Sequence, residues 1–405
     1  MKYPKQLDSI FNKLNAYSIQ PIIVGGYVRD QLLHRDSKDI DVELYGIDSL
    51  EKLEKILKEF GEVNSVGKSF GVCKLKFKGL EIDFSLPRED SKISSGHRGF
   101  SITTNSNLDF KTASSRRDFT INAIGFDVLK KELLDPFSGQ EDIKKSLLRA
   151  VDLNKFGEDP LRVLRAVQFA SRFQFQLDDA LFKVCKKMVE TELLEELPKE
   201  RIFEEIKKLL LKSKTPSVGI SLLKKLKSPL YFDAFYTMLD ALDYLAQQEI
   251  KDKNLKLYLM LALLNYKLTQ EQRDSFLNLL TDKKELREEV ERVVQQKDAL
   301  SIKECDEYKL YKLSISVNIE KLLILLDAVT LGKEKEKIAS LKEKAIKLHI
   351  LHQKVKPLIQ GKDLIKLGYK PSPKFSLLLD KIYDAQIRSE FKNNLEALAW
   401  IKRNL

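Results

Sequence analysis

Two aspartates, Asp39 and Asp41, form the feature of this sequence that is best suited to chemistry. They lie one residue apart in the run DIDVEL, which is typical of a β-strand, so their carboxylates point to the same face. Carboxylates held side by side repel each other unless a divalent cation lies between them. The preceding glycines, Gly25 and Gly26, allow the backbone to approach a phosphate, and Arg29 supplies a charged donor. This combination indicates nucleotidyl transfer.

A third carboxylate, Asp83 in LEIDFSLPR, belongs to a separate predicted strand that can pair near the first. Three carboxylates suit two Mg²⁺ ions, one activating a 3′-hydroxyl and the other bound to a triphosphate. Acidic pairs also occur by chance on polar strands, and Asp83 has a plain alternative as an exposed position on an edge strand. On these residues alone, both interpretations stay open.

A second group of polar residues lies in SSRRDFTINAIGFD. Arg117 can bind a triphosphate in a bidentate manner, and either Asp118 or Asn122 can accept a hydrogen bond from a ribose hydroxyl. The structural alternative is a salt-bridged helix start with Asp118 as its cap.

The third group, FGEDPLRVLRAVQF, has a helix-opening Asp159-Pro160 pair. Capping explains these two residues but leaves Arg162 and Arg165 unexplained. The spacing places both arginines on the helix face of Asp159, where acceptors and donors together can read the Watson–Crick edge of a base. A protein surface of this kind can select a nucleotide without a nucleic-acid template.

The elements that position these groups fall into two classes. Over the first 145 or so residues, short β-like runs alternate with turns and helices, including a hairpin signal at Lys78-Gly79 and a polar stretch, 88–115, that predicts a long loop. Later segments carry helical apolar spacing. We therefore predict an α+β N-terminal head with a mixed β-sheet, followed by an extended all-α body. The expected divisions are a head at 1–145, a helical neck at 146–212, a body at 213–355 and a tail at 356–405.

Composition narrows the class of protein. The 405 residues carry a net charge of +11, which is compatible with a polyanionic partner and equally with a lysine-rich solvated surface. Three scattered cysteines argue against a disulfide framework or a zinc site and fit a reducing cytoplasm. The charged N-terminus is no signal peptide, and no apolar run approaches about 18 residues, so we expect no membrane span.

The ordered motifs GGYVRD with DID, RRDFTINA, DPFSGQEDI, EDPLRVLR and LPKERIFEEI span roughly residues 22–210. In this order they resemble the bacterial class II tRNA nucleotidyltransferases, the family of CCA-adding enzymes and poly(A) polymerases. The resemblance implies that Asp39 and Asp41 hold Mg²⁺ and that Gly26 and Arg29 contact the nucleotide. It assigns the triphosphate to Arg117. The remaining implied roles are a template for CTP and ATP at Asp159 and Arg162, assistance from Arg165, and bracing of that helix by Glu200, Arg201 and Glu204.

The same resemblance implies tRNA as the partner, bound through its acceptor and TΨC half by the helical body, with the protein most simply a monomer. A full-length stretch at 88–115 favours complete CCA addition, and A-addition onto tRNA ending in CC is the alternative. A poly(A) polymerase and an inactive RNA-binding homologue are further alternatives. The sequence departs from many relatives at Gln168, where they carry a third arginine, and it lacks an HD signature.

Overall fold

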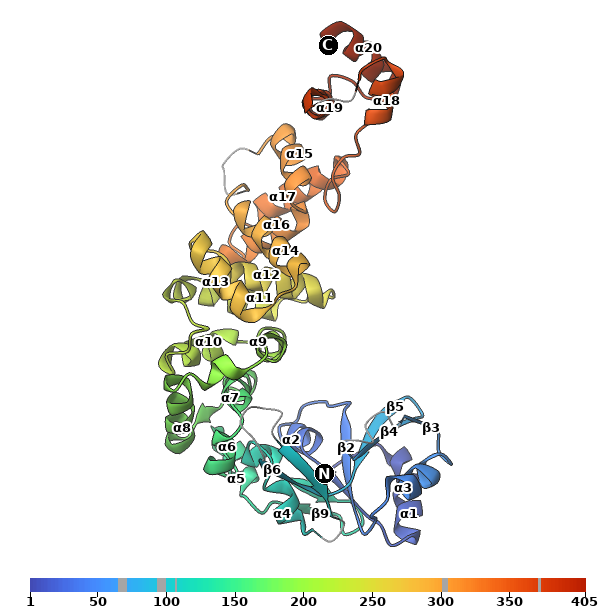
Figure 1. Cartoon of the computed structure of the whole chain (residues 1–405), viewed down its shortest axis with the longest axis vertical. Helices are drawn as coiled ribbons and strands as arrows, with labels where there is room; N and C mark the ends of the chain where they lie inside the picture. The colour runs from blue at the N-terminus through green and yellow to red at the C-terminus, as the bar shows by residue number, and fades with distance from the viewer. Residues whose placement is uncertain (65–70, 93–99, 106–107, 301–304, 371–372) are drawn as a thin grey trace. The chain divides into compact units, whose positions relative to one another are not determined.

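The computed structural model describes residues 1–64, 71–92, 100–105, 108–300, 305–370 and 373–405. The chain divides into two compact units, Met1–Phe232 and Asp233–Leu405, which are drawn from blue to green and from yellow to red in Figure 1. Within the described ranges, no helix has the length and apolar character needed to cross a membrane. The first unit holds every residue on which the sequence predicts chemistry.

A seven-stranded sheet in the order β3-β4-β5-β2-β1-β8-β9 forms the scaffold of the first unit. Its strands are β1 (Gln20–Val24), β2 (Ile40–Tyr45), β3 (Glu62–Asn64), β4 (Val72–Phe77), β5 (Leu80–Ser85), β8 (Gly125–Asp127) and β9 (Glu132–Leu134). Only the β2–β5 pair is parallel among these neighbours, and the other pairs are antiparallel. The predicted mixed sheet is confirmed.

The predicted hairpin at Lys78-Gly79 joins β4 to β5. Both residues have positive φ angles, +46° and +80°, as a two-residue turn matched to the twist of the strands requires. Along β4, Cys73, Leu75 and Phe77 are buried while the lysines between them face outward. The sequence alternation therefore decides which face of the sheet meets the core.

The core of the first unit lies between the sheet and the helices α1 (Asp8–Ala16), α2 (Gly26–Leu32) and α3 (Leu50–Leu57). Helices α1 and α3, which lie side by side in Figure 1, contact each other and pack on β1 and β4, respectively. Fully buried side chains such as Phe84 and Leu44 join this core, each stabilising it by about 1.5–3 kcal/mol. The packing holds β2 and β5 in fixed register, which is what the candidate site requires.

The predicted long loop at 88–115 is wrong over its described part. Strands β6 (Arg88–Lys92) and β7 (Phe100–Thr104) pair as an antiparallel two-stranded sheet, and α4 (Phe110–Ser114) follows. Runs of five residues are too short to show a clear period, and backbone hydrogen bonds between the two strands do not depend on side-chain alternation. Residues 93–99 and 106–107 of this stretch lie outside the described residues.

The first unit continues as helices and two short strands. The helices are α5 (Gly139–Lys144), α6 (Leu153–Gly157), α7 (Leu161–Phe173), α8 (Asp179–Glu190), α9 (Lys199–Lys212) and α10 (Pro216–Lys225), and β10 (Leu147–Leu148) pairs with β11 (Gln176–Leu177). Single 3₁₀ turns occur at Lys5–Leu7, Thr120–Asn122 and Leu193–Glu196. Helix α7 packs against both α9 and α10, so its orientation is set by apolar contacts on the side away from its arginines.

In its described residues, the second unit is helical, as predicted for the body. A 3₁₀ turn at Asp233–Met238 precedes α11 (Leu239–Gln247), α12 (Lys253–Asn265), α13 (Gln270–Leu280), α14 (Lys284–Gln295), α15 (Glu307–Ser316), α16 (Ile319–Val329), α17 (Lys335–Lys347), α18 (Gly361–Lys366), α19 (Pro373–Ile387) and α20 (Asn394–Asn404). Helix α12 is apolar almost all round and packs against α11, α14 and α16, so it is the centre of that helical group, while residues of α18, α19 and α20 form a separate small core.

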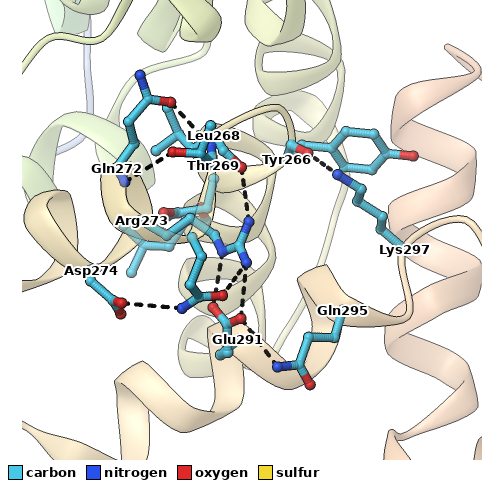
Figure 2. Close-up of polar contacts among 12 residues, drawn as sticks. Tyr266, Leu268, Thr269, Gln272, Arg273, Asp274, Glu291, Gln295 and Lys297 are labelled. Atoms are coloured by element: carbon cyan, nitrogen blue, oxygen red, sulfur yellow. Dashed lines mark hydrogen bonds and ion pairs between the residues drawn. The ribbon is translucent and has the colours of Figure 1, made fainter.

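One arginine network ties the start of α13 to α14 (Figure 2). Arg273 donates to both oxygens of Glu291 at 3.0 and 3.1 Å and to the carbonyl of Leu268 at 2.8 Å. Thr269 and Gln272 form a reciprocal capping box at the same helix start. This half-buried, bidentate ion pair fixes the angle at which the chain enters α13.

Candidate active site

A cavity of about 450 Å³ in the first unit brings together most of the residues singled out from the sequence. It is lined by Gly26, Arg29, Asp41, Arg116, Arg117, Asp118, Asn122, Asp159, Leu161, Arg162, Arg165, Phe169 and Arg201. These residues come from α2, β2, the segment around the 3₁₀ turn at 120–122, α7 with the residue two positions before it, and α9. Residues nearly 180 positions apart in sequence therefore share one polar, strongly basic hollow.

The predicted carboxylates lie at and beside the start of β2. Asp41 is opposite Asp83 in the parallel β2–β5 pair, and Asp39 precedes β2 by one residue. Surrounding protein raises the pKa of the Asp41 carboxyl although the side chain keeps solvent access; Arg117 opposes the rise, and the charges of Asp83 and Asp39 add to it. Asp41 therefore carries a negative charge that the protein only partly compensates.

Asp83 does not line the cavity; it lines a neighbouring pocket of about 230 Å³. Lys74 on the adjacent strand β4 donates to its Oδ2 at 2.7 Å. Since this lysine side chain is 61% exposed, the pair is a solvated one that exchanges easily with water or another cation.

The carboxylate oxygens are the ligand type that Mg²⁺ prefers, and the raised pKa of Asp41 marks an unmet charge that such an ion can neutralise. The donor chemistry of Asp39 and Asp41 thus fits a magnesium ion. In the described part of the chain, however, no three His, Cys, Asp or Glu side chains are already clustered as a metal site.

Arg117 is the available anion-binding group of the cavity. Burial lowers the pKa of its guanidinium, with Arg116 adding to the effect. The structure assigns its side chain no hydrogen bond or ion pair with any described residue, although the charges of Glu43 and Asp41 lie near it. Gly25 makes room for it, since a Cβ there would lie 2.7 Å from Arg117 Nη1 and the backbone has φ +68°. A free guanidinium in such a hollow attracts a phosphate group.

Asp118, in contrast, is fully engaged within the protein. Its Oδ2 accepts from Arg165 Nε and Nη2 at 2.7 and 2.5 Å, and its Oδ1 accepts from Asn122 Nδ2 and the Phe119 amide, both at 2.9 Å. Burial alone would raise the pKa of Asp118, but Arg165 and Asn122 hold it below its usual value. The structural alternative from the sequence is half right: Asp118 is salt-bridged, but it does not cap a helix, because the 3₁₀ turn at Thr120–Asn122 has Phe119 at its N-cap and no side-chain cap.

Asn122 continues this network to Arg29. Its Oδ1 accepts from Arg29 Nη1, and Arg29 also donates through Nε and Nη2 to Asp30 at 2.8 and 2.7 Å. Arg29 is 4% exposed, so most of its donors face protein groups. Gly26 lies beside it, and a Cβ at Gly26 would make only an ordinary contact at 3.5 Å. The close glycine contact is therefore at Gly25.

Asp159 and Arg162 lie together at the start of α7. Asp159 Oδ1 accepts from the Leu161 amide at 3.1 Å, the capping contact expected from the sequence, and the structure gives Oδ2 no partner among the described residues. Arg162 donates to the carbonyls of Lys155 and Arg116 at 3.1 and 2.9 Å. These two bonds fix the guanidinium while leaving further N–H groups to face the cavity.

The sequence analysis did not single out Glu43, a buried acid that holds Arg116 at the wall of the cavity. Glu43 is on the Asp39 and Asp41 face of β2, with a side chain only 1% exposed. Its Oε1 accepts from Arg116 at 3.0 Å and its Oε2 from the Tyr45 hydroxyl at 2.7 Å. The i+2 spacing from Asp41 was the available signal. Because the carbonyl of Arg116 holds Arg162, Glu43 connects the carboxylate strand to α7.

Four further residues, three on α9 and one on α7, complete the comparison with the sequence predictions. Arg201 on α9 lines the cavity, whereas Glu200 and Glu204 are not among its lining residues. Gln168 on α7 is 3% exposed and does not line the cavity; its amide nitrogen lacks a hydrogen-bond partner among the residues that the structure describes.

Comparison with known families matches three segments of the chain. Residues 22–149 match the model of the poly(A) polymerase head domain, residues 174–227 that of the probable RNA- and SrmB-binding site of polymerase A, and residues 248–401 that of a putative second domain of tRNA nucleotidyltransferase. The three matches follow the order of the head and helical elements described above.

Among similar sequences, the multifunctional CCA proteins of Neisseria gonorrhoeae and Aliivibrio salmonicida are 36% and 37% identical over 207 and 210 residues. Each alignment includes 51% of this chain, and it covers 48% and 49% of the respective relative. The chain thus spans about half the length of the curated relatives it matches.

Among solved structures, the Bacillus stearothermophilus CCA-adding enzyme in complex with CTP has a TM-score of 0.77 at 24% identity. The alignment covers 100% of this chain and 98% of that chain, so the fold is shared along the whole length. A tRNA-processing enzyme is 25% identical, with a TM-score of 0.66 and coverage of 94% of this chain and 98% of that one.

Proposed function

We propose that the chain, as a member of the class II tRNA nucleotidyltransferase and poly(A) polymerase family, adds the 3′-terminal CCA to tRNA, using CTP and ATP. One observation carries the proposal: three groups of complementary chemistry line the same cavity. They are a guanidinium without a partner among the described residues, a carboxylate whose charge the protein only partly neutralises, and a donor–acceptor pair suited to the edge of a base. These are Arg117, Asp41 and the Asp159–Arg162 pair.

Arg117 is the proposed triphosphate ligand because its donors have no hydrogen-bond partner among the described residues and it lies close to Asp41. Arg29 and Gly26 border the same position. Arg29 has most of its donors on Asp30 and Asn122, so its contribution is to keep the β1–α2 turn in place beside the phosphates. Asp118 and Asn122 position Arg165 and Arg29 while lining the cavity.

Asp159 and Arg162 are the proposed base selectors. Cytosine and adenine share an exocyclic amine donor next to a ring-nitrogen acceptor, whereas uracil and guanine present the reverse order on that edge. The free oxygen of Asp159 can accept from the amine while Arg162 donates to the ring nitrogen. Arg165, held by Asp118, borders the same pair and keeps α7 oriented.

Asp39 and Asp41 are the residues that would hold Mg²⁺, with Asp83 as the third carboxylate of the group. Such an ion supplies charge neutralisation for the triphosphate and activates the attacking hydroxyl. In the reaction, the RNA 3′-oxygen forms a bond to the α-phosphorus, the bond to the bridging oxygen breaks, and pyrophosphate leaves. The hydroxyl proton passes toward the carboxylate group.

The remaining parts of the proposal concern the partner and the surroundings of the reaction. We assign the head to 1–145, the neck to 146–212, and tRNA binding to the helices of 213–355 and 356–405, acting on the acceptor and TΨC half. Recognition is then by shape and phosphate contacts, because paired RNA hides its base edges. Three free, buried cysteines fit a cytoplasmic protein, and a monomer suffices because one chain lines the whole cavity.

The deciding experiment uses the purified chain with tRNA transcripts ending before CCA, after the first C, and after CC, each with labelled CTP or ATP. Incorporation of CTP on the first two and of ATP on the third is expected. Absence of incorporation on every substrate rejects the proposal, and incorporation of ATP alone, only after CC, identifies an A-adding protein. ATP tailing of unstructured RNA with equal efficiency identifies a poly(A) polymerase.

Asp39→Ala separates chemistry from binding in the same assay. Transfer is expected to stop while the Kd for tRNA stays within about twofold, since one carboxylate contributes nothing favourable to polyanion binding. A parallel loss of tRNA binding would assign Asp39 a structural role instead.

A further inference from the structure

Arginines and aromatic rings alternate along one side of α7, starting in the cavity and ending at the surface. Phe169 and Phe173, one helical turn apart, stack with centroids 5.5 Å apart and planes inclined by 14°. The guanidinium of Arg29 lies over both rings, 5.2 and 4.7 Å from their centroids, and Arg165 lies 5.3 Å from that of Phe169. Each contact stabilises a cation against an aromatic face.

The outer end of this stack holds two more guanidinium groups on a single ring. Arg172 and Arg35 lie 4.9 and 5.0 Å from the centroid of Phe173, and Arg35 Nη1 donates to the carbonyl of Arg172 at 3.2 Å. Arg35 is exposed, and the side chain of Arg172 is 23% exposed. We name Arg35 and Arg172 the outer arginine pair.

The outer arginine pair carries more positive charge than its neighbours compensate. Asp30 is shared, with Oδ1 2.7 Å from Arg29 and Oδ2 3.5 Å from Arg172. No ion pair between Arg35 and a described acidic residue is present. Three guanidinium groups, those of Arg29, Arg35 and Arg172, lie within reach of the Phe173 ring, and Asp30 is the one described carboxylate that forms ion pairs with them. Donors of the outer arginine pair therefore remain directed at solvent. Planar guanidinium groups stacked in this way are pre-organised for phosphate oxygens.

The position of the outer arginine pair relative to the carboxylates differs from that of Arg117. Arg35 lies in the segment 33–39, which links α2 to β2 and ends at Asp39, and the charge of Asp39 acts on Arg172. Arg117 instead lies against Gly25, close to Asp41. The segment also carries the exposed Asp36 and Lys38, whose charges offset each other.

We infer that Arg35 and Arg172 bind a phosphodiester of the RNA strand whose 3′ end is extended, on the Asp39 side of the carboxylates. The inference rests on the proposed function, and it adds an RNA contact within the head. It separates two phosphate sites by their location: the incoming triphosphate at Arg117, and the backbone of the growing strand at the outer arginine pair. The aromatic stack holds the pair rigid, so little side-chain entropy is lost when a phosphate binds.

The test compares Arg35→Ala with wild-type protein, using a tRNA transcript ending in CC. Loss of one charge-assisted phosphate contact predicts about a tenfold rise in the Kd and KM for RNA. It also predicts a slope of log K against log salt that is smaller in magnitude by about 0.7–0.9. The KM for ATP and the Tm are expected to stay unchanged, because Arg35 is exposed and outside the nucleotide cavity. Arg35→Lys keeps the charge and is expected to restore the salt slope and part of the affinity.

Lys58→Ala is the matched control, since it removes an exposed cation at the C-cap of α3 that forms an ordinary i,i+4 pair with Glu54. If Arg35→Ala changes the RNA affinity and salt slope no more than this control, the inference is overturned. A rise in the KM for ATP without one for RNA overturns it as well and assigns Arg35 to the triphosphate. If the wild-type protein neither binds nor extends tRNA, the proposed function itself is rejected. That outcome differs from failure of the inference alone, in which wild-type protein is active and the Arg35→Ala variant behaves like the control.

Discussion

Replacing Glu43 with glutamine tests whether this buried acid holds the wall of the cavity together. The substitution keeps the shape of the side chain and an acceptor for the Tyr45 hydroxyl, but removes the charge that faces Arg116 at 3.0 Å. Arg116 then remains as a largely buried cation, with a side chain 17% exposed and an Nε that already lacks a partner.

Breaking a buried pair by removing one partner costs about 3–5 kcal/mol, and the partial exposure of Arg116 places this case near 3 kcal/mol. For a unit of this size, each kcal/mol lost from the free energy of unfolding lowers the Tm by about 2–4 °C. The Tm of the first unit is therefore expected to fall by about 6–12 °C. Because the Arg116 carbonyl accepts from Arg162, the variant is also expected to discriminate less well between CTP and UTP.

Calorimetry with Glu43→Gln, Arg116→Gln and the double variant measures the coupling directly. The double variant is expected to recover part of the loss, because no unpaired charge remains. The control is Glu59→Gln, which removes the acid of an exposed 2.8 Å pair with Lys13 and is expected to leave the Tm unchanged. A Tm for Glu43→Gln equal to that of the control would refute the reasoning.

Three further outcomes follow from the same geometry. Asp41→Asn is expected to abolish transfer yet raise the Tm at neutral pH, because the pKa of Asp41 is raised on folding and its ionisation therefore costs stability. The gain in Tm should vanish as the pH falls below the ordinary pKa of an aspartate. A variant less stable than wild type at pH 7 would contradict this. Asp118→Asn should lower the Tm at neutral pH by the equivalent of about 3 kcal/mol, because Arg165 holds the pKa of this carboxyl low. In wild-type protein the stabilisation by the ionised Asp118 is lost only as the pH falls through that lowered pKa. Thermal scans of both proteins between pH 2 and 7 check the direction of this pH dependence. Asp159→Ala and Arg162→Ala should each raise misincorporation of UTP about tenfold or more relative to CTP in competition assays, and unchanged preference would remove them from base selection.

Local patterns were sufficient for much of the architecture. The alternation in VCKLKF and LEIDFS, with Lys78-Gly79 between them, predicted a hairpin because turn type and side-chain period are properties of adjacent residues. The same holds for Asp159 at the start of α7, whose contact with the Leu161 amide spans two positions. The order of the short motifs also indicated the family, since each motif keeps its chemistry within a few residues.

The tertiary structure determined which of these groups remain available to a ligand. Arg117 and Arg165 have the same chemistry in the sequence, but Asp118 binds Arg165 through both Nε and Nη2, while Arg117 keeps its donors. Asp83 became a neighbour of Asp41 only through the parallel β2–β5 register. Residues 88–92 and 100–104 form the β6–β7 pair through backbone hydrogen bonds, although each run is too short for its side-chain pattern to predict a strand.

The sequence by itself therefore determined the residue types of the site and the elements that carry them, whereas the fold decided their partners. An ion pair or a strand register depends on distances between residues far apart in the chain, such as the 73 positions between Glu43 and Arg116. Local pattern carries no information on those distances. Packing of α7 and of the sheet sets them, and so decides which carboxylate is compensated and which guanidinium is free.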